Sequence, residues 1–185
     1  MKKTTKIISI ALSLCFVLIL GIVGVLAVPN INLEIGGNIS FSAEGVKATI
    51  LQGSMTKGPL SDGSTQSSSI MKQVSITTTQ TQSELETAVS NANWHDLDLV
   101  FNTSGQAEIS FSIRNDSSSV LYISISEETG TQSTSNNVTI TTTGSTQIAA
   151  GQTSAYKVAF KTANTEMDAG LEAFKITFNL SLTQA

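Results

Sequence analysis

Histidine, cysteine and charged residues are scarce in this chain, and their scarcity excludes several classes of site. The 185 residues include one histidine, His95, and one cysteine, Cys15, and only 13% of them are charged. A zinc site built from histidine and cysteine needs three or four such ligands, so we expect none. A single cysteine also excludes an internal disulfide, so packing and backbone hydrogen bonds must hold any folded domain together. We expect no cofactor.

Proline and aromatic residues are also few. There are two prolines, and aromatics make up 5% of the chain, whereas Ser and Thr fill 50 of its 185 positions. A mucin-like stalk would combine such a Ser/Thr content with abundant proline and no apolar alternation. Threonine is at home on the polar face of a strand, because its branched Cβ fits the pleated surface. The composition therefore favours a β-protein with a polar, weakly charged surface.

Catalytic and metal-binding motifs are missing. The chain has no GxSxG nucleophile setting, no HExxH and no glycine-rich phosphate loop, so we assign no catalytic residue and expect a protein that is not an enzyme. Asp96 and Asp98 fall on one face of an expected strand, about 7 Å apart, which makes them weak candidates for calcium. A solvated polar face that discourages aggregation is the simpler interpretation, so we assign no metal site.

The first 28 residues indicate export. Three lysines are followed by an apolar run from Ile7 to Val28, and the positive-inside rule places everything after that run outside the cytoplasm. Its 22 residues suit a membrane anchor, whereas Val25-Leu26-Ala27 followed by Pro29 suits cleavage of a signal peptide. Both interpretations stay open. Residues 1–28 are thus a signal peptide or anchor helix, and residues 29–185 form one extracellular domain.

The charge of the exported part limits its partners. Three of the ten basic residues and none of the fourteen acidic ones lie in the N-terminal segment, which leaves seven basic against fourteen acidic residues. Nucleic acid and anionic lipid both need a cationic face, so neither is expected as a partner. The membrane is a partner only through the N-terminal helix, if that helix is not cleaved.

Apolar and polar residues alternate with a period of two in about nine stretches, which is typical of strands with one buried face. The clearest stripes run through Ile109–Ile113, Leu121–Ile125, Tyr156–Phe160 and Phe174–Leu182, with shorter ones at Leu97–Phe101, Ile39–Phe41, Val46–Ile50, Val74–Ile76 and Val138–Ile140. These strands predict an all-β fold, an antiparallel β-sandwich of immunoglobulin-like or jelly-roll-like type.

The sequence also predicts the connections. Asn115 to Ser118 should form a hairpin turn, Ala150-Gly151-Gln152 a tight turn, and Lys57 to Ser69 a loop without regular structure. One short helix is expected from Glu84 to Asn91, with Ser83 and Glu86 as its capping box. We expect that helix to lie across one end of the sandwich and to close its core.

One alternating segment lies between the membrane segment and the domain. Ile31, Leu33 and Ile35 alternate within Val28–Ile35. Such a strand can serve as the first strand of its own domain, or it can add to the sheet of a neighbouring copy. It is therefore a candidate strand-exchange segment.

Three stretches of the exported part resemble a known family. They read LDLVFNTSGQAEISFSIRNDSSSVLYISIS, IAAGQTSAYKVAFKT and GLEAFKITFNLSL. Together with the lysine-rich export segment they are similar to the camelysin/TasA-type secreted β-sandwich proteins of Gram-positive bacteria. The resemblance implies a matrix protein that forms extracellular fibres. Some members are described as surface metalloproteases, but no metal-ligand set can be assigned here.

Two functions follow as expectations. The first is an exported structural, matrix or cell-surface protein that associates with itself or with other surface components and forms fibres by strand addition. The alternative is an extracellular adhesin or carbohydrate-binding module. That alternative requires outward-facing aromatic rings, of which Tyr122 is the clearest.

Overall fold

The computed structural model describes residues 33–58, 66–95, 97–101, 106–127, 138–162 and 173–182. All of them belong to one compact unit, Ile31–Ala185. The expected export helix within residues 1–28 lies outside the described residues, so its fate stays a prediction. Within the described ranges, no helix is both long enough and apolar enough to cross a membrane.

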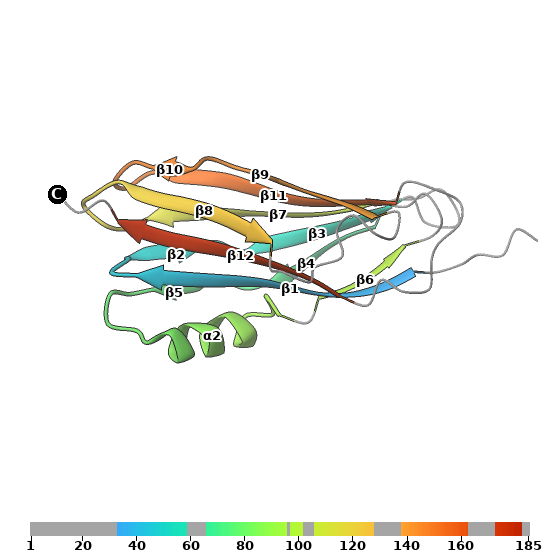
Figure 1. The fold of residues 1–185 in the computed structure, drawn as a ribbon, viewed down its shortest axis with the longest axis horizontal. Helices are drawn as coiled ribbons and strands as arrows, with labels where there is room; N and C mark the ends of the chain where they lie inside the picture. Colours follow the sequence, from blue (N-terminus) through green and yellow to red (C-terminus); the bar gives the residue numbers. More distant parts are fainter. Residues whose placement is uncertain are drawn as a thin grey trace, which may run out of the picture. The chain divides into compact units, whose positions relative to one another are not determined.

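The unit consists mostly of strands arranged in two sheets, with one short helix (Figure 1). This confirms an all-β fold. The five-stranded sheet has the order β10 (Gln147–Ile148), β8 (Leu121–Glu127), β12 (Ala173–Leu182), β1 (Leu33–Glu44), β6 (Leu97–Phe101). The seven-stranded sheet has the order β4 (Gln66–Met71), β3 (Gly53–Gly58), β7 (Gln106–Asn115), β11 (Thr153–Thr162), β9 (Val138–Thr143). In it, β2 (Ala48–Ile50) joins β7 to β5 (Val74–Ile76).

A single hydrophobic core joins the two sheets. Most of the described apolar side chains in the expected stripes are buried, with Ile109, Ile113, Val158 and Phe178 all fully inaccessible to solvent. Aromatic rings from both sheets meet at its centre. The ring centroids of Phe111 on β7 and Phe178 on β12 lie 5.2 Å apart in an edge-to-face arrangement, the geometry that aromatic pairs favour. The period-two pattern therefore predicted correctly which face of these strands is buried.

The expectation of a wholly antiparallel fold is wrong for one pair. β1 and β12 run parallel, from Gly36 opposite Ala173 to Glu44 opposite Ser181. Every other strand pair in the described part is antiparallel. Parallel neighbours cannot be joined by a tight turn, and here the rest of the unit connects them. As a result, β1 lies inside its sheet, between β12 and β6.

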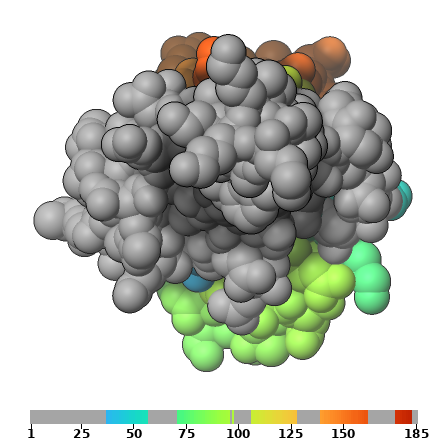
Figure 2. All heavy atoms as spheres, turned by 90° about the vertical axis from the view of Figure 1, so that its right-hand side faces the viewer, coloured from blue at the N-terminus to red at the C-terminus, as the bar shows by residue number. Residues whose placement is uncertain are grey.

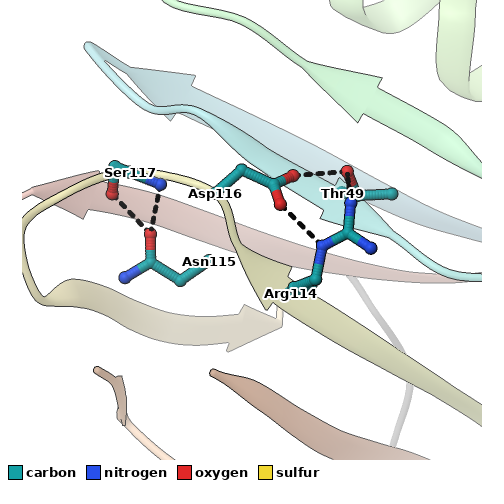
Figure 3. Close-up of polar contacts among 5 residues, drawn as sticks. All are labelled: Thr49, Arg114, Asn115, Asp116 and Ser117. Atoms are coloured by element: carbon teal, nitrogen blue, oxygen red, sulfur yellow. Dashed lines mark hydrogen bonds and ion pairs between the residues drawn. The ribbon is translucent and has the colours of Figure 1, made fainter. Parts of the chain in front are cut away.

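The segment from Asn115 to Ser118 is not a hairpin turn, because β7 and β8 belong to different sheets. Asn115 is fully buried where the chain crosses, and its Nδ2 donates to the carbonyl oxygens of Ser119 (2.7 Å) and Ile148 (2.9 Å). Its Oδ1 accepts from the Ser117 backbone N–H at 3.0 Å and from the Ser117 hydroxyl (Figure 3). A buried amide satisfied in this way holds the corner between the sheets.

A second polar group lies beside this corner (Figure 3). Asp116 accepts from Arg114 Nε at 2.6 Å and from the buried hydroxyl of Thr49 at 2.5 Å. The hydrogen bond from Arg114 is the main reason that the pKa of Asp116 is lowered. These contacts join β2 to the end of β7, so we assign them a structural role at the corner.

Lys57 to Ser69 was expected to be a loop, but its described ends are strands. Lys57 ends the ladder between β3 and β4, opposite Gln66, and β3 also pairs with β7. A Cβ added to Gly53 would lie 2.7 Å from Met71 Cε and 2.9 Å from Trp94 Cη2, so any larger residue where β3 begins would force these side chains to shift. The expected tight turn at Gly151 is present, with φ of 71° and a hydrogen bond from Gln152 N to Ala149 O of 3.0 Å.

The expected helix is present as α2 (Gln82–Asn91), but its cap is Thr81 and not Ser83. Glu84 Oε2 accepts from the Thr81 N–H at 2.7 Å, and Thr81 Oγ1 accepts from the Glu84 N–H at 3.3 Å. The hydrogen bonds from Thr81 lower the pKa of Glu84. The helix lies alongside β1 and β5 and does not cross an end of the core (Figure 1). Leu85 and Val89 are its buried residues.

Candidate functional site

The candidate strand-exchange segment lies at the start of β1. Ile31 is outside the described residues, while Leu33 and Ile35 belong to β1 and face Phe101 and Leu99 of β6. Residues 33–37 pair with β6, and among the described residues the pairing with β12 runs from Gly36, opposite Ala173, where the described part of β12 begins. We call the position that residues 33–37 occupy beside β6 the slot.

The remainder of that edge of β1 is covered after the pairing with β6 ends. Ile39 N donates to the carbonyl oxygen of Trp94 at 3.3 Å, and Gln82 Nε2 donates to the carbonyl oxygen of Phe41 at 3.4 Å. An uncovered edge would offer unpaired backbone groups to any passing strand. Helix α2 and the segment that follows it therefore cover the edge of β1 at residues 39–41. No sequence pattern predicted this role, because one of the two groups is a backbone carbonyl.

His95 lies just before β6 and has a structural partner. Its Nδ1 is 3.2 Å from Asn38 Nδ2, so the two side chains connect the entrance of β6 to β1. Asn38 Oδ1 and His95 Nε2 are buried and have no partner among the described residues. The contact therefore links the start of β6 to β1 beside the slot.

The weak calcium candidates are not brought together in the described part. Asp96 lies outside the described residues, and the backbone of Asp98 in β6 faces Gly36. Among the described side chains, no three of the His, Cys, Asp and Glu types lie close enough to share a metal ion.

The outer face of the five-stranded sheet is polar and almost uncharged. Ser40 and Thr177 share a hydrogen bond of 2.8 Å, Ser42 donates to Asn179 Oδ1, and Asn179 Nδ2 is 3.4 Å from Ser126 Oγ. Among the described residues, Tyr122 is the one exposed large hydrophobic side chain, with 36% of its surface accessible. The expectation that Tyr122 points outward is therefore met, but no second ring joins it there.

Comparisons with protein-family models, with curated proteins and with solved structures found no match to this chain.

Proposed function

We propose that this chain is an exported structural or matrix protein of the cell exterior and that it associates with itself by exchanging the leading residues of β1. The observation that carries the proposal is the slot itself: within the described part of the chain, β6 is the strand that pairs with residues 33–35, and the α2 segment covers the neighbouring stretch of β1. The apolar N-terminal run, the polar surface and the resemblance to camelysin/TasA-type proteins support it. The finer fold that we propose is an immunoglobulin-like or jelly-roll-like β-sandwich behind a signal peptide or anchor helix.

Strand exchange needs little free energy, because backbone pairs within one copy are replaced by the same pairs between two copies. If residues 33–37 leave β6, the same residues of another copy can restore all five backbone pairs in the same register. The net change is then dominated by the entropy of association, which a high local concentration at the cell surface offsets. Because each copy both gives and receives a strand, the contact is head-to-tail and extends into a filament unless it closes into a ring.

A disulfide across the slot tests this proposal. Glu34 faces Val100 on β6, so Glu34→Cys with Val100→Cys, in residues 28–185, should lock β1 to its own sheet when oxidised. We expect monomers by size-exclusion chromatography and negative-stain microscopy after oxidation, and filaments after reduction. The matched control is Thr56→Cys with Ser67→Cys, which face each other on β3 and β4 and should allow filaments in both states. Because an exchanged strand would bring the same two cysteines together between copies, oxidation is carried out on isolated monomers, and filaments that then assemble from these oxidised monomers would refute exchange at this slot.

A deletion gives a second readout. Removing Val28–Ile35 should abolish any polymer, because it removes the leading residues of β1 that pair with β6. The buried core, which begins at Ile39, should stay folded and retain its β-type circular dichroism. A deleted protein that still forms filaments would exclude this segment as the connection between copies.

The second candidate function is an adhesin or carbohydrate-binding module. The exposed ring of Tyr122 beside a face of hydroxyl and amide groups favours it, since sugar rings stack on flat aromatic surfaces. Tyr122→Ala should then release the protein from insoluble polysaccharide while the folded core is unchanged. A monodisperse wild-type monomer that binds polysaccharide through Tyr122 would favour this candidate over strand exchange.

A further inference from the structure

A depression of about 530 Å³ lies on the outer face of the seven-stranded sheet, where β3, β7, β11 and β9 run side by side. The residues that line it are Thr56, Gln106, Ala107, Glu108, Thr139, Thr141, Ala159, Phe160 and Lys161. Pockets of 300–1,000 Å³ are typical of small-molecule sites. Helix α2 and the strands β9 and β11 lie on opposite sides of the unit (Figures 1 and 2), so this surface is separate from the edge of β1 that α2 covers.

The register between the four strands explains the depression. Thr56 faces Glu108, Glu108 faces Ala159, and Ala159 faces Thr141, so these four side chains form one row across four strands. Successive residues on one face of a strand are two positions apart, which places Lys161 on the same face as Ala159. A methyl group therefore forms the floor, and longer polar side chains stand around it.

The charges around the depression do not cancel. Lys157 Nζ is 2.9 Å from Glu108 Oε1, and Ser110 Oγ donates to the same oxygen at 3.0 Å. The hydrogen bond from Lys157 is the main cause of the lowered pKa of Glu108. Lys161, which is exposed, has no ion pair or hydrogen bond with any described residue. Among the described residues, the rim thus carries one positive charge, that of Lys161, without a described counter-charge, on a protein of net negative charge.

The hydrogen-bonding groups that are exposed in the depression indicate which type of ligand it can bind. Within the depression, the backbone groups of β7 and β11 are engaged in ladders on both sides, so recognition depends on side chains. A peptide strand would need free backbone partners, which the face does not offer. Sugar hydroxyls both donate and accept, and so do the hydroxyls of Thr56, Thr139 and Thr141. The C–H face of a sugar ring can rest on the Ala159 methyl group.

We propose that this depression binds a saccharide that carries a carboxylate, with Lys161 pairing the carboxylate, the three threonines and Gln106 binding hydroxyls, and Ala159 supporting the ring. The inference goes beyond the proposed strand exchange, because neither surface contributes residues to the other. A matrix protein with both surfaces would link its own polymer to an acidic polysaccharide.

The test uses the full chain in a neutral detergent and measures binding to an immobilised oligogalacturonate by interferometry. Ala159→Leu fills the floor and should reduce the affinity at least about tenfold, because the ring can no longer enter. The matched control is Ala155→Leu, the same change at an exposed position on the same face of β11, opposite Ser112, and it should bind like the wild type. Lys161→Gln should weaken binding about fivefold and reduce its dependence on salt.

Three results would overturn the proposal. The first is equal binding of oligogalacturonate by Ala159→Leu and by Ala155→Leu. The second is equal binding of the neutral methyl ester of the same oligosaccharide, which would remove the role of Lys161. The third is equal binding of an oligoglutamate, which would show that charge alone is recognised. The Glu34/Val100 disulfide variant should bind the oligosaccharide normally in both redox states, so failure of strand exchange would leave this result intact.

Discussion

Replacing Asn115 with aspartate should make the stability of the unit depend on pH in an unusual direction. The amide Nδ2 donates to the carbonyl oxygens of Ser119 and Ile148, at 2.7 and 2.9 Å. Aspartate has the same shape, but an ionised carboxylate would place an oxygen against those two carbonyls. Both carbonyls lose their donor, and a charge is buried at a position with no accessible surface.

The expected loss of stability in Asn115→Asp can be worked out from these contacts. A protonated aspartate can still donate to one carbonyl, so Asn115→Asp at low pH should lose about 1–2 kcal/mol, one buried hydrogen bond. Burial near two carbonyl oxygens should raise the pKa of the new carboxyl by about 2–3 units, each of which corresponds to about 1.4 kcal/mol. At pH 7 the total loss should then be about 4–6 kcal/mol, a large part of the stability of a typical domain.

The direction in which the stability of Asn115→Asp changes with pH follows from the difference between the pKa values of the folded and unfolded states. A carboxyl whose pKa is higher in the folded state than in the unfolded state favours folding only while it is protonated. The stability is fully present below about pH 4 and is lost as the pH rises through the folded pKa. The difference between wild type and Asn115→Asp should therefore grow from pH 4 to pH 7. Asn115→Ala, which cannot titrate, should show a difference of about 2–4 kcal/mol at both values.

Urea denaturation of residues 29–185, followed by fluorescence, measures these differences. Trp94 is the single tryptophan of the chain and is fully buried, so its emission reports unfolding of the core. If Asn115→Asp were as stable as the wild type at pH 7, or if its deficit did not change with pH, the two donated hydrogen bonds would not hold the corner.

Three further predictions concern other parts of the unit. Gly53→Ala should cost about 1–3 kcal/mol, because the new methyl group would lie 2.7 Å from Met71 Cε, and an unchanged urea midpoint would show that the core yields there. Thr81→Ala should cost about 1 kcal/mol by removing the helix cap, while Thr81→Ser should restore it in the same assay. The hydrogen bond from Arg114 lowers the pKa of Asp116, so that carboxylate stabilises the fold above about pH 4, and its contribution disappears as the pH falls through the lowered pKa. An acid titration of Asp116→Asn, monitored by circular dichroism, should show less loss of stability over that range than the wild type.

The buried faces of the strands were predictable because burial on one face leaves a period of two in the sequence. Ile109, Phe111 and Ile113 alternate with polar residues and are buried as expected. That period says which face is buried but not which sheet a strand joins. β7 and β8 both show it, yet they belong to different sheets, and only the buried Asn115 marks the crossing.

The strands β3 and β4 were missed for a different reason. They are mostly serine, threonine and other polar residues, and Met55 and Met71 are the buried apolar side chains among those that the structure describes there, so almost no alternation is visible. They form because β7 offers an edge for β3 to pair with. The helix cap was missed because two overlapping capping motifs begin at Thr81 and Ser83, and sequence alone does not decide between them.

The candidate slot was predictable in part. The alternation of Leu33 and Ile35 indicated a strand, but its pairing with β6 depends on residues more than sixty positions away. The depression around Ala159 had no sequence signal, because it arises where four strands place one small residue among longer ones. Features that depend on register between distant strands are beyond what a local pattern can indicate.

The parallel pairing of β1 with β12 also sets the order in which the molecule can mature. Ser40 and Thr177, which bond across this pair, are 137 positions apart in the chain. Most of the unit lies between β1 and β12 in the chain, so β1 can complete this pair only when that intervening chain is available. Closure over such a long loop is entropically costly and intrinsically slow. A newly exported copy would therefore pass through a stage in which β1 lacks its partner β12, and a high concentration of copies at that stage would favour pairing of β1 with another molecule's sheet.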